Sequence, residues 1–187
     1  MVKLIDIASI RSGYNFREGI KDIENGDLQV IQFKDLSGLF FEDQNIYLHI
    51  FKEQIRMNHW LDFNDILISN RGNYKASVNH CRKPSVASGV FFILKIHNDH
   101  FLPEYIATFL NSQVGQKALM IRHNLAGVHS INRVELEQID IPLIPLEKQK
   151  QIVELFLLYE KEVDIMEKIK QNRKKLINSI LSQTIKE

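Results

Sequence analysis

The chain has 187 residues, of which 44% are hydrophobic and 25% are charged, so it can bury a core and is not of the disordered class. It has no run of about 18 apolar residues and no basic leader followed by an apolar stretch, which argues against a membrane span and a secretory signal. We therefore expect a cytoplasmic protein of one domain, or of one domain with an extension. The single cysteine, Cys81, has no partner for a disulfide and lacks the spacing of a zinc site.

Positive charge is concentrated in the middle of the chain, although the net charge is only +1. Positions 66–134 carry eight Lys or Arg residues against two acids. Positions 1–65 carry seven against eleven, and positions 135–187 carry nine against ten. This segregation is typical of a protein with one surface that meets a polyanion. A segment that is basic by chance and faces ordinary solvent is the alternative.

Short apolar runs bounded by Gly, Asn and Asp favour strands at 28–33, 45–50, 65–69 and 86–96. Pro103 and Glu104 are start signals of a helix, which we expect to continue through Arg122 with an optional break near Gly115. A short helix at 134–138 and a last strand at 139–141 precede the prolines at 142 and 145. The first 145 residues therefore predict a sheet-rich globular domain.

From Leu146 to about Lys186 the sequence has no Gly and no Pro, which predicts one helix about 60 Å long. Apolar residues recur along it in a 4-3-4-3 spacing, the pattern of a helix that packs against a partner helix. Folding back on its own domain is the alternative for the first three turns. The predicted stripe consists of Ile152, Phe156, Tyr159, Val163 and Met166, with Ile177 and Ile180 in the same frame.

Residues needed for several DNA chemistries are missing from the sequence. It has no Asp/Glu-x-Lys tripeptide of the commonest restriction nucleases and no adjacent prolines as in an amino-methyltransferase. It also has no Gly-Lys-Ser/Thr or Gly-x-Gly phosphate loop and no His-Glu-x-x-His arrangement. His97 and His100 flank Asp99 without a strong ligand set around them. We therefore expect a binding protein with no catalytic residue and no metal, with a small enzyme of unrecognised type as the alternative.

Five phrases, in this order, resemble the specificity subunit of type I restriction-modification enzymes. The last phrase is the most specific, because it is bounded by prolines and runs into the long helix. Together the phrases cover nearly the whole chain. They are LIDIASIRSG at 4–13, VIQFKDL at 30–36, NDILISNRG at 64–72, LPEYIATFLNS at 102–112 and IDIPLIPLEKQKQIV at 139–153.

The resemblance implies a sequence-specific DNA-binding subunit that does no chemistry itself. In that family each target-recognition domain reads half of a split DNA target, and long helices space the domains and dock the methylation subunits. S-adenosylmethionine and ATP are used by the partner methylation and restriction subunits, so no cofactor is expected on this chain. The implied fold is α+β, with a recognition domain at 1–145 and a long helix at 146–187.

This sequence contains one domain-plus-helix repeat, whereas the usual subunit of that family contains two. We expect a half-subunit that forms a homodimer through an antiparallel coiled coil, because a two-fold axis restores two recognition domains. A truncated product is the alternative to a natural half-subunit. The alternative function is a helical scaffold or regulator that docks on a methyltransferase without reading DNA.

Two polar, acid-free loops and one early turn are the candidates for DNA contact. Arg, Asn and Gln read base edges, whereas Lys, Ser, Thr and Tyr hold phosphates. At 69–75, Arg71 and Asn73 are candidates for base reading, with bracing of the turn as the alternative for Arg71. Lys75, Arg82 and Lys83 suit phosphate contact. The full predicted set is Ser69, Asn70, Arg71, Asn73, Tyr74, Lys75, Arg82, Lys83, Arg122, Asn124, His129, Ser130, Arg11 and Tyr14.

Overall fold

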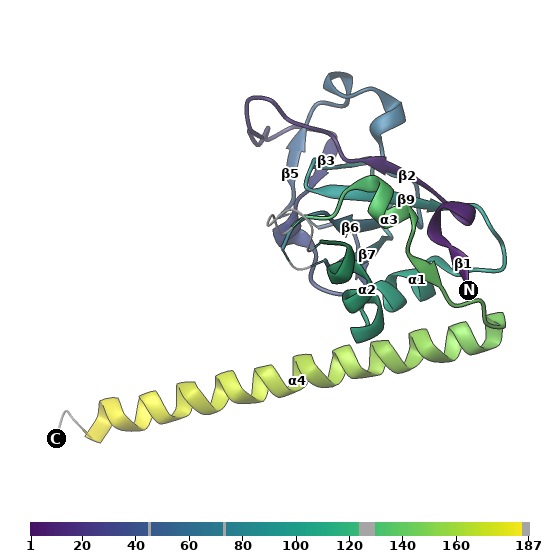
Figure 1. The fold of residues 1–187 in the computed structure, drawn as a ribbon. Coiled ribbons are helices and arrows are strands. Elements are labelled where there is room, and N and C mark those ends of the chain that lie inside the picture. The colour runs from purple at the N-terminus through teal and green to yellow at the C-terminus, as the bar shows by residue number, and fades with distance from the viewer. Residues whose placement is uncertain (45, 73, 124–129, 185–187) are drawn as a thin grey trace.

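The computed structural model describes residues 1–44, 46–72, 74–123 and 130–184. Strands and short helices form a globular domain, and one long helix runs beneath it and extends well beyond it (Figure 1). The expected α+β class is therefore confirmed. The strands are β1 Val2–Lys3, β2 Ala8–Ser12, β3 Leu28–Ile31, β4 Phe40–Phe41, β5 Leu48–Ile50, β6 Ile66–Ser69, β7 Ala76–Asn79, β8 Ser85–Ala87, β9 Phe91–Ile96 and β10 Asp140–Ile141.

Short helical segments connect and cover these strands. The α-helices are α1 Pro103–Asn111, α2 Gln113–His123, α3 Arg133–Glu137 and α4 Leu146–Thr184. The single-turn 3-10 helices are η1 Leu4–Asp6, η2 Phe33–Asp35, η3 Lys52–Gln54 and η4 Met57–His59. Among the described residues, no helix is both long and apolar enough to cross a bilayer.

Two sheets stacked face to face form the centre of the domain. The larger has the order β2-β9-β6-β7-β4, and the smaller has the order β5-β3-β8. Side chains alternate across β6, so Ile66 and Ile68 pack toward the helices while Leu67 packs toward the smaller sheet. The helices α1 and α3 therefore cover one face of the larger sheet, and the smaller sheet covers the other.

The polar strand β7 at Ala76–Asn79 was not among the predicted strands. Its ASVN sequence has one β-branched residue, Val78, and no aromatic residue, so it carries little of the composition that marks a strand, yet all four residues are buried. Tertiary contacts supply the missing pairing. The Asn111 side chain at the end of α1 accepts a hydrogen bond from the Ala76 amide and donates one to the Ala76 carbonyl, both at 2.8 Å. β4 pairs only with Val78 and Asn79 of β7, so the Asn111 side-chain amide takes the place of a paired strand at Ala76.

The predicted strand at 86–96 is two strands, separated by a turn at Ser88–Val90. β8 belongs to the smaller sheet and β9 to the larger one, so this turn connects the two sheets. The predicted helix from Pro103 is present, and its break lies at Ser112, where the backbone leaves the helical region. The close packing after this break requires a glycine at position 115, because a Cβ there would lie 2.1 Å from the Phe109 carbonyl oxygen.

A buried glutamine fixes the start of α4 to the domain. Gln149 is fully buried, and its Oε1 accepts a hydrogen bond from the Leu102 amide at 2.9 Å. Its Nε2 donates to the carbonyl oxygens of His100, at 2.7 Å, and Ile144, at 2.9 Å. One side chain thus joins α4, the segment before it and the segment that leads into α1.

Contact between α4 and the domain continues for about four turns and then ends. Val153 is buried, Phe156 is half-buried, and a Glu160 carboxylate oxygen accepts the Leu39 amide at 3.1 Å. These positions share one face with Gln149. From Lys161 to Gln183 every side chain is exposed, over about 35 Å of helix. The folded-back alternative therefore holds only for the first turns.

We predict that Gln149→Ala lowers the free energy of unfolding by about 3 kcal/mol, because two backbone carbonyls and one backbone amide lose their hydrogen bonds to this fully buried side chain. Urea unfolding followed by circular dichroism measures the change. The matched control is Gln151→Ala, an exposed glutamine in the same helix, which should change the free energy by less than about 0.5 kcal/mol. Equal effects of the two substitutions would contradict the role given to Gln149.

Candidate nucleic-acid interface

The loop between β6 and β7 presents Arg71 to solvent at one end of the stacked sheets. Asn70, before it, is fixed by its amide to the Val90 carbonyl at 2.9 Å and by its side chain to the Gly89 carbonyl at 3.1 Å. Gly72 has a positive φ of 68°, which lets the chain reverse there. The Arg71 guanidinium makes no hydrogen bond or ion pair to the described residues, so the bracing role considered for it is not supported.

The second candidate loop meets the first one through the backbone. Ser130 forms a β-bridge with Arg71, and the Ile131 amide donates to the Asn70 carbonyl at 3.1 Å. The two loops, about 60 residues apart in sequence, therefore lie side by side at Ser130. Asn73, Asn124 and His129 lie outside the described residues, as does the side chain of Arg122.

Three residues of the 69–75 stretch support the loop from within. Ser69 is 1% exposed and accepts the Lys75 amide through its Oγ at 3.0 Å. Tyr74 is 2% exposed and lies in the main core. The Lys75 Nζ donates to the Leu36 carbonyl at 2.8 Å, and burial lowers the pKa of this amine. In this structure the Lys75 amine, which was expected to contact phosphate, braces the loop internally.

The early turn is also engaged internally. Arg11 donates to the carbonyls of His59 at 3.2 Å and Trp60 at 2.7 Å, and pairs with Asp65 at 3.3 Å. Tyr14 is half-buried, with its ring edge-on to Phe16 at 4.9 Å between centroids. These two residues position the turn, and Arg11 has no free donor face comparable to that of Arg71.

Asp65 explains why Arg11 is held in place. Its side chain is 1% exposed, and burial raises the pKa of its carboxyl. A backbone N–H from Asp62 and the Arg11 guanidinium oppose that rise. The ion pair and the Asp62 amide both engage Oδ2 of this costly buried carboxylate, whereas its buried Oδ1 has no hydrogen-bond partner among the described residues.

Arg82 and Lys83 lie at the opposite end of the β6–β7 pair from Arg71. They follow the carboxyl end of β7, whereas Arg71 precedes its amino end. Their backbone amides both donate to the Asp43 carboxylate, at 3.1 and 3.2 Å. A phosphate at this end would meet the charge of Asp43, so the structure does not bring these two cations into one surface with Arg71.

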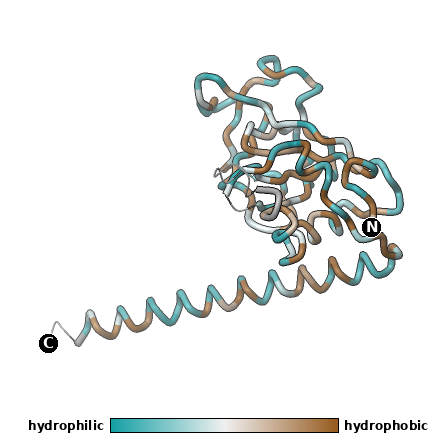
Figure 2. Tube along the Cα trace, in the orientation of Figure 1, coloured by the Kyte–Doolittle hydropathy of each residue, from teal (hydrophilic) through white to brown (hydrophobic). Residues whose placement is uncertain are grey.

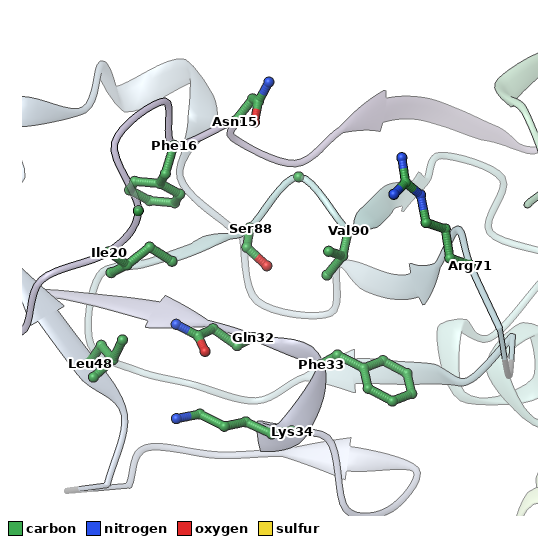
Figure 3. Close-up of a pocket in the computed structure, with 12 residues that line it drawn as sticks. Asn15, Phe16, Ile20, Gln32, Phe33, Lys34, Leu48, Arg71, Ser88 and Val90 are labelled. Atoms are coloured by element: carbon green, nitrogen blue, oxygen red, sulfur yellow. The ribbon is translucent and has the colours of Figure 1, made fainter.

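A groove of about 800 Å³ lies beside Arg71, where the loops at the ends of both sheets converge (Figure 3). Among the described residues, its lining contains two cations, Arg71 and Lys34, and no carboxylate. Asn15 and Gln32 add amides that can both donate and accept hydrogen bonds. Apolar side chains, including Phe16, Ile20, Phe33, Leu48 and Val90, complete the lining.

Sequence reasoning missed Asn15, Gln32, Lys34 and Val90 as groove residues. Lys34 and Gln32 lie in the acid-rich first third of the chain, so counting charge by segment concealed them. Asn15 follows Gly13, whose Cβ would lie 2.1 Å from the Ser88 carbonyl oxygen, so the early turn presses directly against the β8–β9 turn. Gly13 was the one feature of the sequence that could have indicated this close approach between the early turn and the β8–β9 turn.

The predicted stripe on α4 is largely exposed. Phe156 faces the domain, while Ile152 is 39% exposed and Tyr159 is 60% exposed. Hydrophobic residues recur along the whole of α4, well beyond the domain (Figure 2). The exposed members of the predicted stripe are Ile152, Tyr159, Val163, Met166, Ile177 and Ile180.

We predict that Arg11→Ala lowers the free energy of unfolding by about 2 kcal/mol, because the buried Asp65 carboxylate loses its ion pair and two backbone carbonyls lose a hydrogen bond. Arg71→Ala should change it by less than about 0.5 kcal/mol, since its side chain contacts solvent. Chemical denaturation of both variants at neutral pH tests the contrast. A loss for Arg71→Ala as large as that for Arg11→Ala would assign Arg71 a structural role.

Comparisons with known proteins agree on one family. Residues 1–173 match the family described as "Type I restriction modification DNA specificity domain". No curated protein matches the chain. A solved structure from a study of complex assembly and conformational transition of the type I R-M system is similar over 91% of this chain and 40% of that one. Its TM-score is 0.66 at 19% identity.

Two further solved structures are specificity subunits. The HsdS subunit from Thermoanaerobacter tengcongensis matches with a TM-score of 0.60 and 17% identity, over 90% of this chain and 38% of that one. The type I S subunit from M. genitalium matches with a TM-score of 0.55 and 13% identity, over 92% of this chain and 42% of that one. At these identities the likeness shows the fold, and this chain spans between 38% and 42% of their length.

Proposed function

Because the chain belongs to the type I restriction modification DNA specificity family, we propose that it reads one half of a split DNA target and carries out no catalysis itself. It guides methylation and restriction subunits in the cytoplasm, and S-adenosylmethionine and ATP bind to those partners. The observation that carries the proposal is the groove beside Arg71, which has two cations and no carboxylate in its lining.

Arg71 is the proposed base-reading residue. Its guanidinium makes no hydrogen bond or ion pair to the described residues, and a planar fork of donors suits the two acceptors of a guanine edge in the major groove. The bridge to Ser130 and the bonds from Asn70 to the β8–β9 turn hold its backbone in place without engaging its side chain. A fixed backbone beneath an exposed, charged side chain allows that side chain to reach a base edge.

Co-expression with the methylation subunit of the same system, followed by genome-wide mapping of modified adenines, tests this function. We predict a symmetric, gapped motif for the wild-type chain. Arg71→Ala relaxes one position of each half-site and weakens binding to the cognate duplex by about 1 to 3 kcal/mol, as measured by fluorescence anisotropy. Lys95→Ala, at the carboxyl end of β9 where Lys95 pairs with Asp62, is the control and should preserve both motif and affinity.

Equal losses for Arg71→Ala on cognate and random duplex would remove Arg71 from base reading. Modification without any motif, or binding to the methylation subunit alone with no binding to DNA, would favour a scaffold over a specificity subunit.

The second part of the proposal is a homodimer through antiparallel α4 helices. From Leu146 to Glu167 the helix carries six acids and three bases, whereas from Lys168 to Thr184 it carries five bases and no acid. An antiparallel pair sets the acidic half of each helix against the basic half of the other, while a parallel pair sets like charges together. This asymmetry supports the antiparallel arrangement and a two-fold axis.

The apolar surface of α4 is wider than one helix pair covers. The stripe with Tyr159 and Val163 is one face, and Leu155, Leu158 and Leu176, exposed by 59% to 69%, lie on a neighbouring face. A two-helix seam uses a narrow stripe. We assign the second face to the methylation subunits.

We predict that Val163→Glu combined with Met166→Glu weakens self-association by at least about tenfold, because it places four carboxylates near the centre of the helix pair. Sedimentation velocity at micromolar concentration measures the change. The matched control, Asn172→Glu with Ser179→Glu, adds the same charge to the opposite face of α4 and should leave the dimer intact. A wild-type chain that sediments as a monomer would contradict the homodimer.

A further inference from the structure

The turn between β8 and β9 joins two walls of the groove. On one side the Ser88 amide donates to the Ile31 carbonyl at 3.0 Å, directly before η2. On the other side the Asn70 amide donates to the Val90 carbonyl at 2.9 Å, directly before Arg71. The segment at 32–34 and the Arg71 loop therefore rise on opposite sides of the same turn, as Figure 3 shows for Lys34 and Arg71.

A buried carboxylate fixes the shape of the wall at 32–34. Asp35 is 7% exposed and accepts the Gln32 amide through Oδ2 at 2.8 Å, while its own amide donates to the Gln32 carbonyl at 3.0 Å. This pair of bonds closes the single turn of η2. The closed turn directs Phe33, which is 43% exposed, and Lys34 outward.

Exposure of Phe33 has no explanation in the packing of the domain. A large aromatic side chain left in solvent beside a free cation marks a contact surface. The Lys34 amine makes no hydrogen bond or ion pair to the described residues. Since the groove lining includes no carboxylate, nothing there competes with a phosphate for Lys34 or Arg71.

We infer that η2 is a second DNA-contacting wall, opposite Arg71, and this inference rests on the proposed function. Lys34 holds a phosphate, and the side-chain carboxamide of Gln32 reads a base edge. Phe33 makes an apolar contact, for which a thymine methyl group is a suitable partner. The groove receives one sugar–phosphate strand. The η2 segment and the Arg71 loop then approach the bases from the two sides of that strand. Neither wall alone encloses a strand, which makes target reading a joint property of both loops.

The test is selection from a library of duplexes with a randomised core, using the full-length chain. Wild type, Phe33→Ala and Gln32→Ala are each taken through selection, and the enriched motifs are compared. We expect each variant to enrich a motif in which one or two positions lose selectivity by about fivefold or more. Phe63→Ala is the matched control, because Phe63 is similarly exposed at 58% but lies outside this groove.

Lys34→Ala has a different expected signature. It should preserve the motif, lower affinity for all duplexes alike, and reduce the slope of log affinity against log salt by about one. Lys95→Ala is its control, because Lys95 is exposed, pairs with Asp62 and lies outside the groove lining, and it should leave that slope unchanged. Thermal unfolding of every variant confirms that the η2 turn, which is held by Asp35, still folds.

The outcomes separate the two proposals. A wild-type chain that enriches no motif overturns the proposed function together with this inference. A wild-type motif that Phe33→Ala and Gln32→Ala both retain unchanged, with an unchanged salt slope for Lys34→Ala, overturns the role of η2 alone and leaves DNA reading by Arg71 standing.

Discussion

The direction in which α4 leaves the domain depends on the buried amide of Gln149. Its three hydrogen bonds reach backbone groups on both sides of the helix start, so the helix cannot pivot without exposing or orphaning them. Glu160, eleven residues later, adds a second attachment at Leu39. Two attachments on one face define the helix axis relative to the domain. A rod whose distance from a reading surface is fixed in this way can act as a spacer, which a flexible tether cannot do.

Periodicity predicted the long elements well, because their physical cause is local. The absence of Gly and Pro after Leu146 predicted α4 nearly to its end, and Pro103 marked the start of α1. β7 escaped prediction because its polar sequence carries little strand signal, and its strand state depends on backbone pairing with β6 and β4, with the Asn111 amide, 35 residues away in sequence, bonding Ala76. The turn at Ser88–Val90 was missed because apolar residues continue on both sides of it, so no change in composition marks the crossing between sheets.

The candidate site was predictable as a region but not as a set of side chains. Charge counting and the Arg, Asn and Lys side chains beside a glycine both pointed to the loop around Arg71, whose guanidinium makes no hydrogen bond or ion pair to the described residues. The same reasoning included Arg11 and Lys75, because sequence does not reveal whether a cation faces a buried carboxylate or a carbonyl. It left out Lys34, because this residue reaches the groove only through the pairing of β3 with β8. Recognition surfaces assembled from distant loops are lost when charge is averaged along the chain.

The β8–β9 turn is held to both walls almost entirely by main-chain groups. Amides and carbonyls are supplied by nearly every residue type, so the side chains at positions 33, 34 and 71 can be exchanged while the scaffold beneath them persists. With such a construction, the residues that contact a ligand can change without a loss of the fold. A lineage under pressure to alter its recognition sequence can sample new wall residues by single substitutions, and each trial protein remains folded while its specificity is tested.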